Sequence, residues 1–130
     1  MSFDDLIGVP FQFGARGPEA YDCFGLTKEV LRRFGIYWDW DIEADELTEP
    51  VRAAISDAFT DGPWVPVDDR RIGDVVLMGA NGKWSHIAPV VTTQGDLLHL
   101  SASTLGAVLL QPNKMRFYGF MRQQAYRWRG

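Results

Sequence analysis

The hydrophobic pattern changes its period once along the 130 residues, and this change restricts the folds open to the chain. From Cys23 to Phe34, apolar positions recur every three or four residues, which predicts a helix that Gly35 ends. A short helix at 5–7 and another at 50–59 are also expected. After residue 63, β-branched runs between turn residues predict strands at 74–78, 86–91, 97–101, 107–111 and 117–121. Helices followed by an antiparallel meander indicate an α+β fold, expected as a single domain over 1–130.

Composition narrows the function classes. A formal charge of −4 argues against a nucleic-acid binder, which normally carries a basic surplus. One cysteine allows neither an intrachain disulfide nor a Cys-rich zinc site. The start of the chain does not read as a signal peptide, and no apolar run approaches the ~20 residues of a membrane helix. We therefore expect a protein made in a host cytoplasm, without membrane insertion.

Cys23 stands at the start of the predicted helix. Unpaired N–H groups and the helix dipole favour an anion there, so this position predicts a nucleophilic thiol with a pKa below the usual ~8.5. The alternative is an inert, buried cysteine. Asp22, directly before it, is either the cap of the helix or a contact for a substrate amine, and both roles are compatible.

A nucleophilic cysteine needs a base, and the chain has two histidines. If the turn between their strands centres on residues 93 and 94, His86 lies opposite Ser101 and His99 opposite Ala88. The two histidines are then diagonal neighbours on one face of the sheet. A turn shifted by half a residue places them on opposite faces, as unrelated strand residues. A zinc site built from both histidines and Cys23 is a weaker alternative, because no local ligand motif such as His-x-x-x-His is present.

The region around Cys23 resembles the opening motif of NlpC-type papain-like cysteine peptidases. It reads GVPFQFGARGPEAYDCFGLTKEVLRRFGI, where the family has G-x-P-[YF]-x-[WF]-G-G and then D-C-[SV]-G-L. Farther along, RRIGDVVLM, SHIAPVV and GDLLHLSAS are similar to the family's P-G-D-[LV], S-H-[VI]-G and G-x-[FI]-[IV]-H-A strands. The resemblance extends over nearly the whole chain, with the motifs in the family's order.

This resemblance implies a papain-like fold, with N-terminal helices packed on an antiparallel sheet, and a cysteine peptidase that needs no metal or other cofactor. It makes Cys23 the nucleophile, His86 the base and His99 the residue that orients the base. The implied substrates are amide bonds in the stem peptides of bacterial peptidoglycan.

The chain departs from the family's usual residues at several positions, and Ala15 stands where the loop has its second glycine. The family's tyrosine, which can donate a hydrogen bond to the oxyanion, is Phe11 here. Gln12 or Tyr21 is a candidate replacement for that donor. Ala88 stands for a glycine, and Pro89 predicts an edge or a bulge in its strand.

A compact chain of this kind looks like peptidases encoded among bacteriophage tail genes. We therefore expect a peptidoglycan hydrolase at the virion tail tip that opens the wall locally during DNA entry, in contact with tail-tip or hub proteins. A structural tail component with little activity, or a delivered antibacterial amidase toxin, remains an alternative. The segments 37–46 and 125–130 are candidate docking surfaces, with Arg127 or Trp128 preferred, although Trp38 and Trp40 could equally cover the helices.

Overall fold

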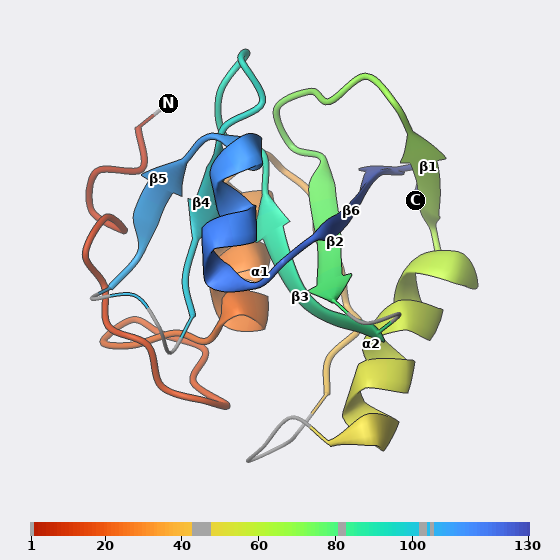
Figure 1. Ribbon diagram of the computed structural model, residues 1–130. Helices are drawn as coiled ribbons and strands as arrows, with labels where there is room; N and C mark the ends of the chain where they lie inside the picture. Colours follow the sequence, from red (N-terminus) through yellow and green to blue (C-terminus); the bar gives the residue numbers. More distant parts are fainter. Residues whose placement is uncertain (1, 43–47, 81–82, 102–103, 105) are drawn as a thin grey trace.

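The computed structural model describes residues 2–42, 48–80, 83–101, 104 and 106–130, and Figure 1 shows their arrangement. Helices and strands follow one another in the expected α+β order. Their bounds are α1 Cys23–Arg33, α2 Glu49–Thr60, β1 Trp64–Val67, β2 Val75–Ala80, β3 Lys83–Pro89, β4 Leu97–His99, β5 Val108–Leu110, the 3-10 helix η1 Pro112–Tyr118 and β6 Arg122–Trp128.

The main sheet is antiparallel, with strand order β1-β6-β2-β3. A second sheet pairs β4 with β5, and a single bridge between Val90 and Leu97 links it to the end of β3. In Figure 1, the β4–β5 pair lies on the left, whereas α2 and β1 lie on the right. Helices packed on antiparallel strands are the arrangement that the resemblance implied.

Helix α1 forms where the apolar period predicted it. Asp22 caps its first turn, and Gly35 follows its end with a φ of 82°, a left-handed conformation that glycine adopts without steric cost. Leu31 points into an aromatic core that lies between the two α-helices and the main sheet, and Leu26 and Val30 point toward β4. The aromatic core includes Phe24, Trp38, Phe59, Trp64 and Tyr126. Because α1 is buried on both sides, its first residue is held at a fixed place.

Two expected elements are wrong. Residues 5–7 form a hydrogen-bonded turn in place of a helix, with Leu6 N–H donating to the Phe3 carbonyl. The strand expected at 117–121 is the end of η1 and a turn at Gly119, whose φ is 90°. Pro112 sits in the first turn of η1, where its fixed φ suits a helix start, and the strand itself begins only at Arg122.

The C-terminal segment is a strand inside the main sheet, which corrects the expected meander and the expectation that residues 125–130 extend freely from the core. β6 lies between β1, which the sequence pattern did not reveal, and β2. Trp128 packs edge-on against Trp64 with ring centroids 5.2 Å apart, and Arg127 binds Asp74 at 2.9 Å. These residues hold the sheet together and are not free to extend to a partner.

The aromatic segment 37–46 is described up to residue 42, and the rest of this hypothesis lies outside the described residues. Trp38 is buried, and Trp40 stacks on it at a centroid distance of 5.5 Å. The two tryptophans therefore cover the helices, as the alternative interpretation held. Tyr37, in contrast, is 74% exposed.

Candidate active site

Cys23 is the first residue of α1, and its position is fixed by the helix cap. The Asp22 carboxylate accepts a hydrogen bond from the Gly25 N–H at 2.7 Å, so the capping role predicted for Asp22 is confirmed. One turn later, the Thr27 hydroxyl donates to the Cys23 carbonyl at 2.7 Å. The thiol therefore projects from a helix start that cannot easily shift.

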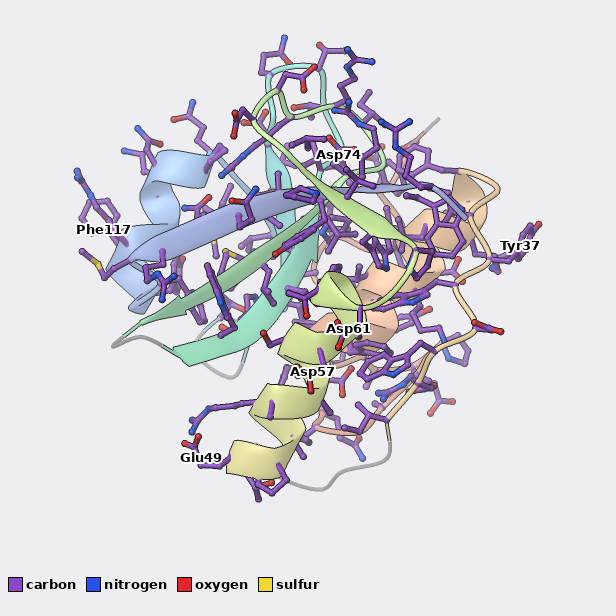
Figure 2. All side chains as sticks on the ribbon, turned by 90° about the vertical axis from the view of Figure 1, so that its right-hand side faces the viewer. Tyr37, Glu49, Asp57, Asp61, Asp74 and Phe117 are labelled. Carbon is purple, nitrogen blue, oxygen red and sulfur yellow. The ribbon has the colours of Figure 1, made fainter. Side chains whose placement is uncertain are left out.

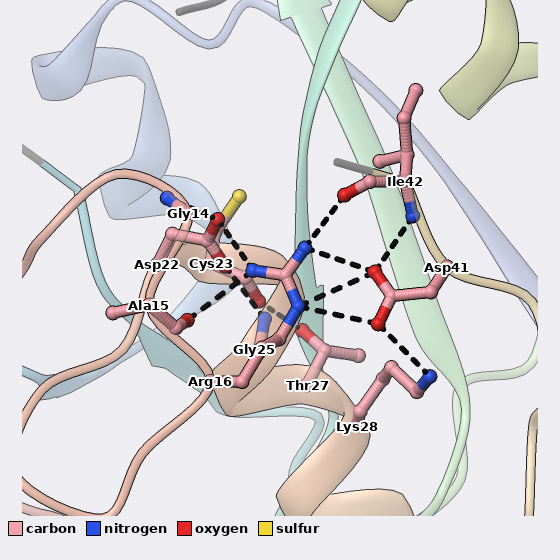
Figure 3. A network of polar contacts seen from close by, with 10 residues as sticks. All are labelled: Gly14, Ala15, Arg16, Asp22, Cys23, Gly25, Thr27, Lys28, Asp41 and Ile42. Atoms are coloured by element: carbon pink, nitrogen blue, oxygen red, sulfur yellow. Dashed lines mark hydrogen bonds and ion pairs between the residues drawn. The ribbon is translucent and has the colours of Figure 1, made fainter. Parts of the chain in front are cut away.

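The second oxygen of Asp22 belongs to a polar network that the sequence did not reveal (Figure 3). It accepts from the Gly14 N–H at 3.0 Å and from Arg16 Nη1 at 2.9 Å. Arg16 in turn binds Asp41 at 2.9 Å and the Ile42 carbonyl at 2.9 Å. We call Arg16, Asp22 and Asp41 the Arg16 network. It ties the glycine-rich loop to the helix start and to the segment after the tryptophans.

The thiol of Cys23 lies in a nonpolar enclosure against β3. Burial raises its pKa to about 12, although the backbone N–H groups of Ile87 and Phe24 act in the opposite direction. The residue keeps part of its surface exposed, but loss of hydration outweighs the helix start. The expected pKa below ~8.5 is therefore wrong for the resting protein, whose thiol is neutral.

The two histidines meet as the predicted register requires. His86 lies on β3 and His99 on β4, and the bridge between Val90 and Leu97 has the register that places the two histidines diagonally. Nε2 of His86 and Nδ1 of His99 are 3.0 Å apart. This confirms the side-by-side arrangement and excludes the shifted turn.

Protein surrounds the histidine pair. Phe120 stacks on His86 with ring centroids 4.6 Å apart and planes inclined by 14°, and Tyr118 lies 5.0 Å from His99. The remaining nitrogen of His99, Nε2, lies 3.2 Å from Ser101 Oγ. The pair is thus held by a chain of polar contacts inside an aromatic cover.

Burial controls the protonation of both histidines. Burial, and to a smaller extent the charge of His99, lower the pKa of His86 well below its usual 6.5. Burial lowers the pKa of His99 to about 4. Both imidazoles are therefore neutral near pH 7, so the resting site pairs a neutral thiol with neutral bases.

The two candidate oxyanion donors lie in different surroundings. Tyr21 is buried in the cluster that contains Leu26, Val30 and Leu98, whereas Cys23 packs against the aromatic core. Gln12 is exposed in the glycine-rich loop, and its backbone N–H bonds to the Tyr21 carbonyl at 3.0 Å. Of the two side chains, only that of Gln12 faces solvent.

A hollow of about 320 Å³ lies on the outward face of α1, away from the histidines. Arg16, Lys28 and Asp41 line part of it, and Asp41 already pairs with both cations. Among the described residues, no three His, Cys, Asp or Glu side chains gather as metal ligands. No helix in the described ranges has the length and apolar content needed to cross a membrane.

Comparison with known proteins shows the family to which the chain belongs. No curated protein matches the chain. A model of the NlpC/P60 family matches residues 8–118, a span that includes Cys23, His86 and His99 and ends before β6. The chain therefore belongs to the NlpC/P60 family, which indicates a cysteine peptidase and a peptidoglycan substrate.

Proposed function

We propose that Cys23, His86 and His99 form the catalytic triad of a peptidoglycan hydrolase that cleaves amide bonds in stem peptides. The observation that carries this proposal is the buried contact of 3.0 Å between the two histidines. His86 is followed on β3 by Ile87, whose backbone N–H lowers the pKa of the Cys23 thiol and therefore lies near it. The strand that carries the base therefore also contacts the nucleophile.

The contacts favour one arrangement of protons. A neutral imidazole has one N–H and one bare nitrogen. When Nε2 of His86 donates to Nδ1 of His99, Nε2 of His99 can donate to Ser101 Oγ, and Nδ1 of His86 is left bare. That bare nitrogen is the base in the proposed reaction, and His99 fixes the tautomer and the ring orientation.

The reaction begins with transfer of the thiol proton to Nδ1 of His86 as the sulfur of Cys23 attacks the amide carbonyl. The C–N bond then breaks, the leaving amine takes the proton from His86, and the substrate acyl group stays on the sulfur as a thioester. Water, deprotonated by His86, hydrolyses the thioester and restores the thiol. The backbone N–H of Cys23 and the side chain of Gln12 are the proposed oxyanion donors, and Asp22 orients the helix start.

The test is digestion of purified peptidoglycan, with the released fragments identified by mass spectrometry. His86→Ala should lower kcat by about 10²- to 10⁴-fold, the usual contribution of a positioned base, and Cys23→Ala should abolish release. Circular dichroism of each variant checks that the fold is kept. Release by Cys23→Ala at the wild-type rate would refute the proposed nucleophile.

For the biological setting we propose the tail tip of a bacteriophage, where residues 1–130 act as one domain that opens the wall during DNA entry. The resemblance of this compact chain to peptidases of phage tail genes supports this setting. Mass spectrometry of purified virions should detect the protein in contact with hub or tail-tip proteins after crosslinking. Its absence from virions would contradict the setting but leave the chemistry intact.

A structural tail component is the second candidate. Phe11 favours it, because a phenyl ring cannot donate the hydrogen bond that the family's tyrosine provides. In that case neither wild type nor Phe11→Tyr should release peptidoglycan fragments, while the protein still assembles into particles.

A further inference from the structure

Charge is divided unevenly along the chain. All 17 acidic residues lie within residues 1–96, whereas residues 97–130 contain no Asp or Glu. The same C-terminal part carries five cationic side chains, those of Lys114, Arg116, Arg122, Arg127 and Arg129. A protein that is acidic as a whole thus ends in a basic region, and such asymmetry is typical of proteins that contact an anionic surface.

The segment from η1 to the start of β6 has two different faces. Met115 is fully buried, and Phe120 stacks on His86, so these side chains face the protein interior. Phe117 and Met121, in contrast, are 70% and 69% exposed. Figure 2 shows Phe117 at the edge of the molecule, pointing into solvent.

Two cations lie near the Phe117 ring, and a third follows Met121 in the sequence. Lys114 Nζ lies 5.8 Å and Arg116 Cζ lies 5.3 Å from the centre of the Phe117 ring. Arg122, directly after Met121, lies over the ring of Trp84 at 4.4 Å. Within the described part of the chain, no carboxylate binds any of these three cations, unlike Arg127, which binds Asp74. Their charge is therefore available to a partner.

We propose that this surface, formed by Lys114, Arg116, Phe117, Met121 and Arg122, docks the protein on a bilayer of anionic lipids. The cations would contact lipid phosphates, and the two apolar side chains would enter the boundary between headgroups and acyl chains. A soluble polyanion would satisfy only the cations and would leave Phe117 and Met121 in water. The combination of unpaired cations with exposed apolar side chains therefore favours a lipid surface.

Docking in this way would set the orientation of the proposed active site. The inward face of the same segment covers His86 and His99, so the histidines would lie close to the membrane surface. The proposal does not depend on catalysis, because none of the five surface residues takes part in the proposed reaction.

Cosedimentation with lipid vesicles tests the proposal. The full chain should bind vesicles of mixed phosphatidylglycerol and phosphatidylcholine, bind pure phosphatidylcholine at least tenfold more weakly, and lose affinity as salt is added. Lys114→Gln with Arg116→Gln should weaken binding to the anionic vesicles about tenfold or more. Phe117→Ser with Met121→Ser should weaken it by a similar factor.

The matched control is Tyr37→Ser, because Tyr37 is 74% exposed and lies at the opposite edge of Figure 2. This variant should bind vesicles like wild type. Cys23→Ala should also bind normally, which separates docking from the proposed hydrolysis. The proposal fails if wild type does not bind anionic vesicles. It also fails if the variant Phe117→Ser with Met121→Ser binds anionic vesicles as tightly as wild type. A third contradicting result is that wild type binds soluble polyphosphate as tightly as vesicles, with an affinity that this double substitution does not change.

Discussion

The Arg16 network lies at the start of α1 and the histidine pair lies on β3 and β4, and the two regions hold ionisable groups in opposite ways. In the Arg16 network, burial favours the neutral carboxyl of Asp41, yet hydrogen bonds from Arg16 and the Ile42 N–H lower its pKa. At the histidine pair, no opposite charge from the described residues compensates for burial, and the pKa values of both rings fall. The Arg16 network keeps its charges because they are paired, whereas the histidine pair stays neutral because burial removes the hydration that a charged ring needs.

Alkylation of Cys23 tests whether burial, as at the histidine pair, also sets the pKa of the thiol. With a pKa of about 12, the resting thiol at about pH 7 should react with iodoacetamide roughly a thousandfold more slowly than the same residue in urea, whose pKa is about 8.5. Mass spectrometry of quenched time points gives both rates. A native rate that matches the unfolded one, with a midpoint below pH ~8.5, would show a thiolate paired with protonated His86. The contrast between the two regions would then break down.

Stability against pH should separate the two regions. The unfolded chain binds a proton on each histidine near pH 6.5, whereas folded His99 resists protonation until about pH 4 and His86 also resists it. The contribution of the two histidines to the unfolding free energy should therefore be fully present above about pH 7 and decrease as the pH drops. The fall should reach about 1.4 kcal/mol per pH unit for each histidine and about 3 kcal/mol for His99 alone.

Urea denaturation between about pH 7.5 and pH 4.5 measures this slope. Asp5, Glu29 and Asp41 have lowered pKa values, so their contribution is lost only at lower pH. His99→Asn should make the slope of unfolding free energy against pH shallower, because one proton fewer is taken up on unfolding. An unchanged slope would mean that His99 is not held neutral in the folded protein.

Removal of the Asp22 carboxylate should destabilise the Arg16 network and with it the folded protein. Asp22→Ala leaves the Gly25 and Gly14 N–H groups and Arg16 without this acceptor, so we expect a loss of about 2 kcal/mol. Asp39→Ala, at an exposed position close to Asp41 in the sequence, is the control and should change the unfolding free energy little. Equal effects of the two substitutions would show that the Arg16 network contributes no stability.

Ser101 provides the smallest test, because its hydroxyl contacts His99. Ser101→Ala should lower kcat about fivefold with little change in KM, the effect of one hydrogen bond of about 1 kcal/mol. Ser101→Thr keeps the hydroxyl and should restore the rate. A loss that appears in KM instead would point to substrate binding rather than to orientation of His99.

Local patterns predicted the parts of the site that depend on nearby residues. The apolar period and Gly35 gave α1 with Cys23 at its start, and the turn at 92–96 set the register that joins His86 to His99. Each of these follows from spacing within a helix or across one turn. The roles of the three residues in catalysis stay a prediction.

The other features depend on distant contacts. Arg16 and Asp41 are 25 positions apart, with no periodicity to connect them. The pKa of Cys23 depends on how closely β3 encloses the thiol, and a helix start says nothing of that. β6 lies between β1 and β2. The hydrophobic pattern within a strand does not specify which strands become its neighbours in the sheet.

The central place of β6 has a consequence for synthesis on the ribosome. β1 and β2 each lack their shared neighbour until residues 122–128 have left the exit tunnel, so the main sheet cannot close before then. The hairpin that carries His86 can form earlier, but its sheet is completed only once β6 has emerged. A ribosome stalled before residue 122 would therefore hold a chain that contains Cys23 and both histidines and yet lacks the sheet that packs them.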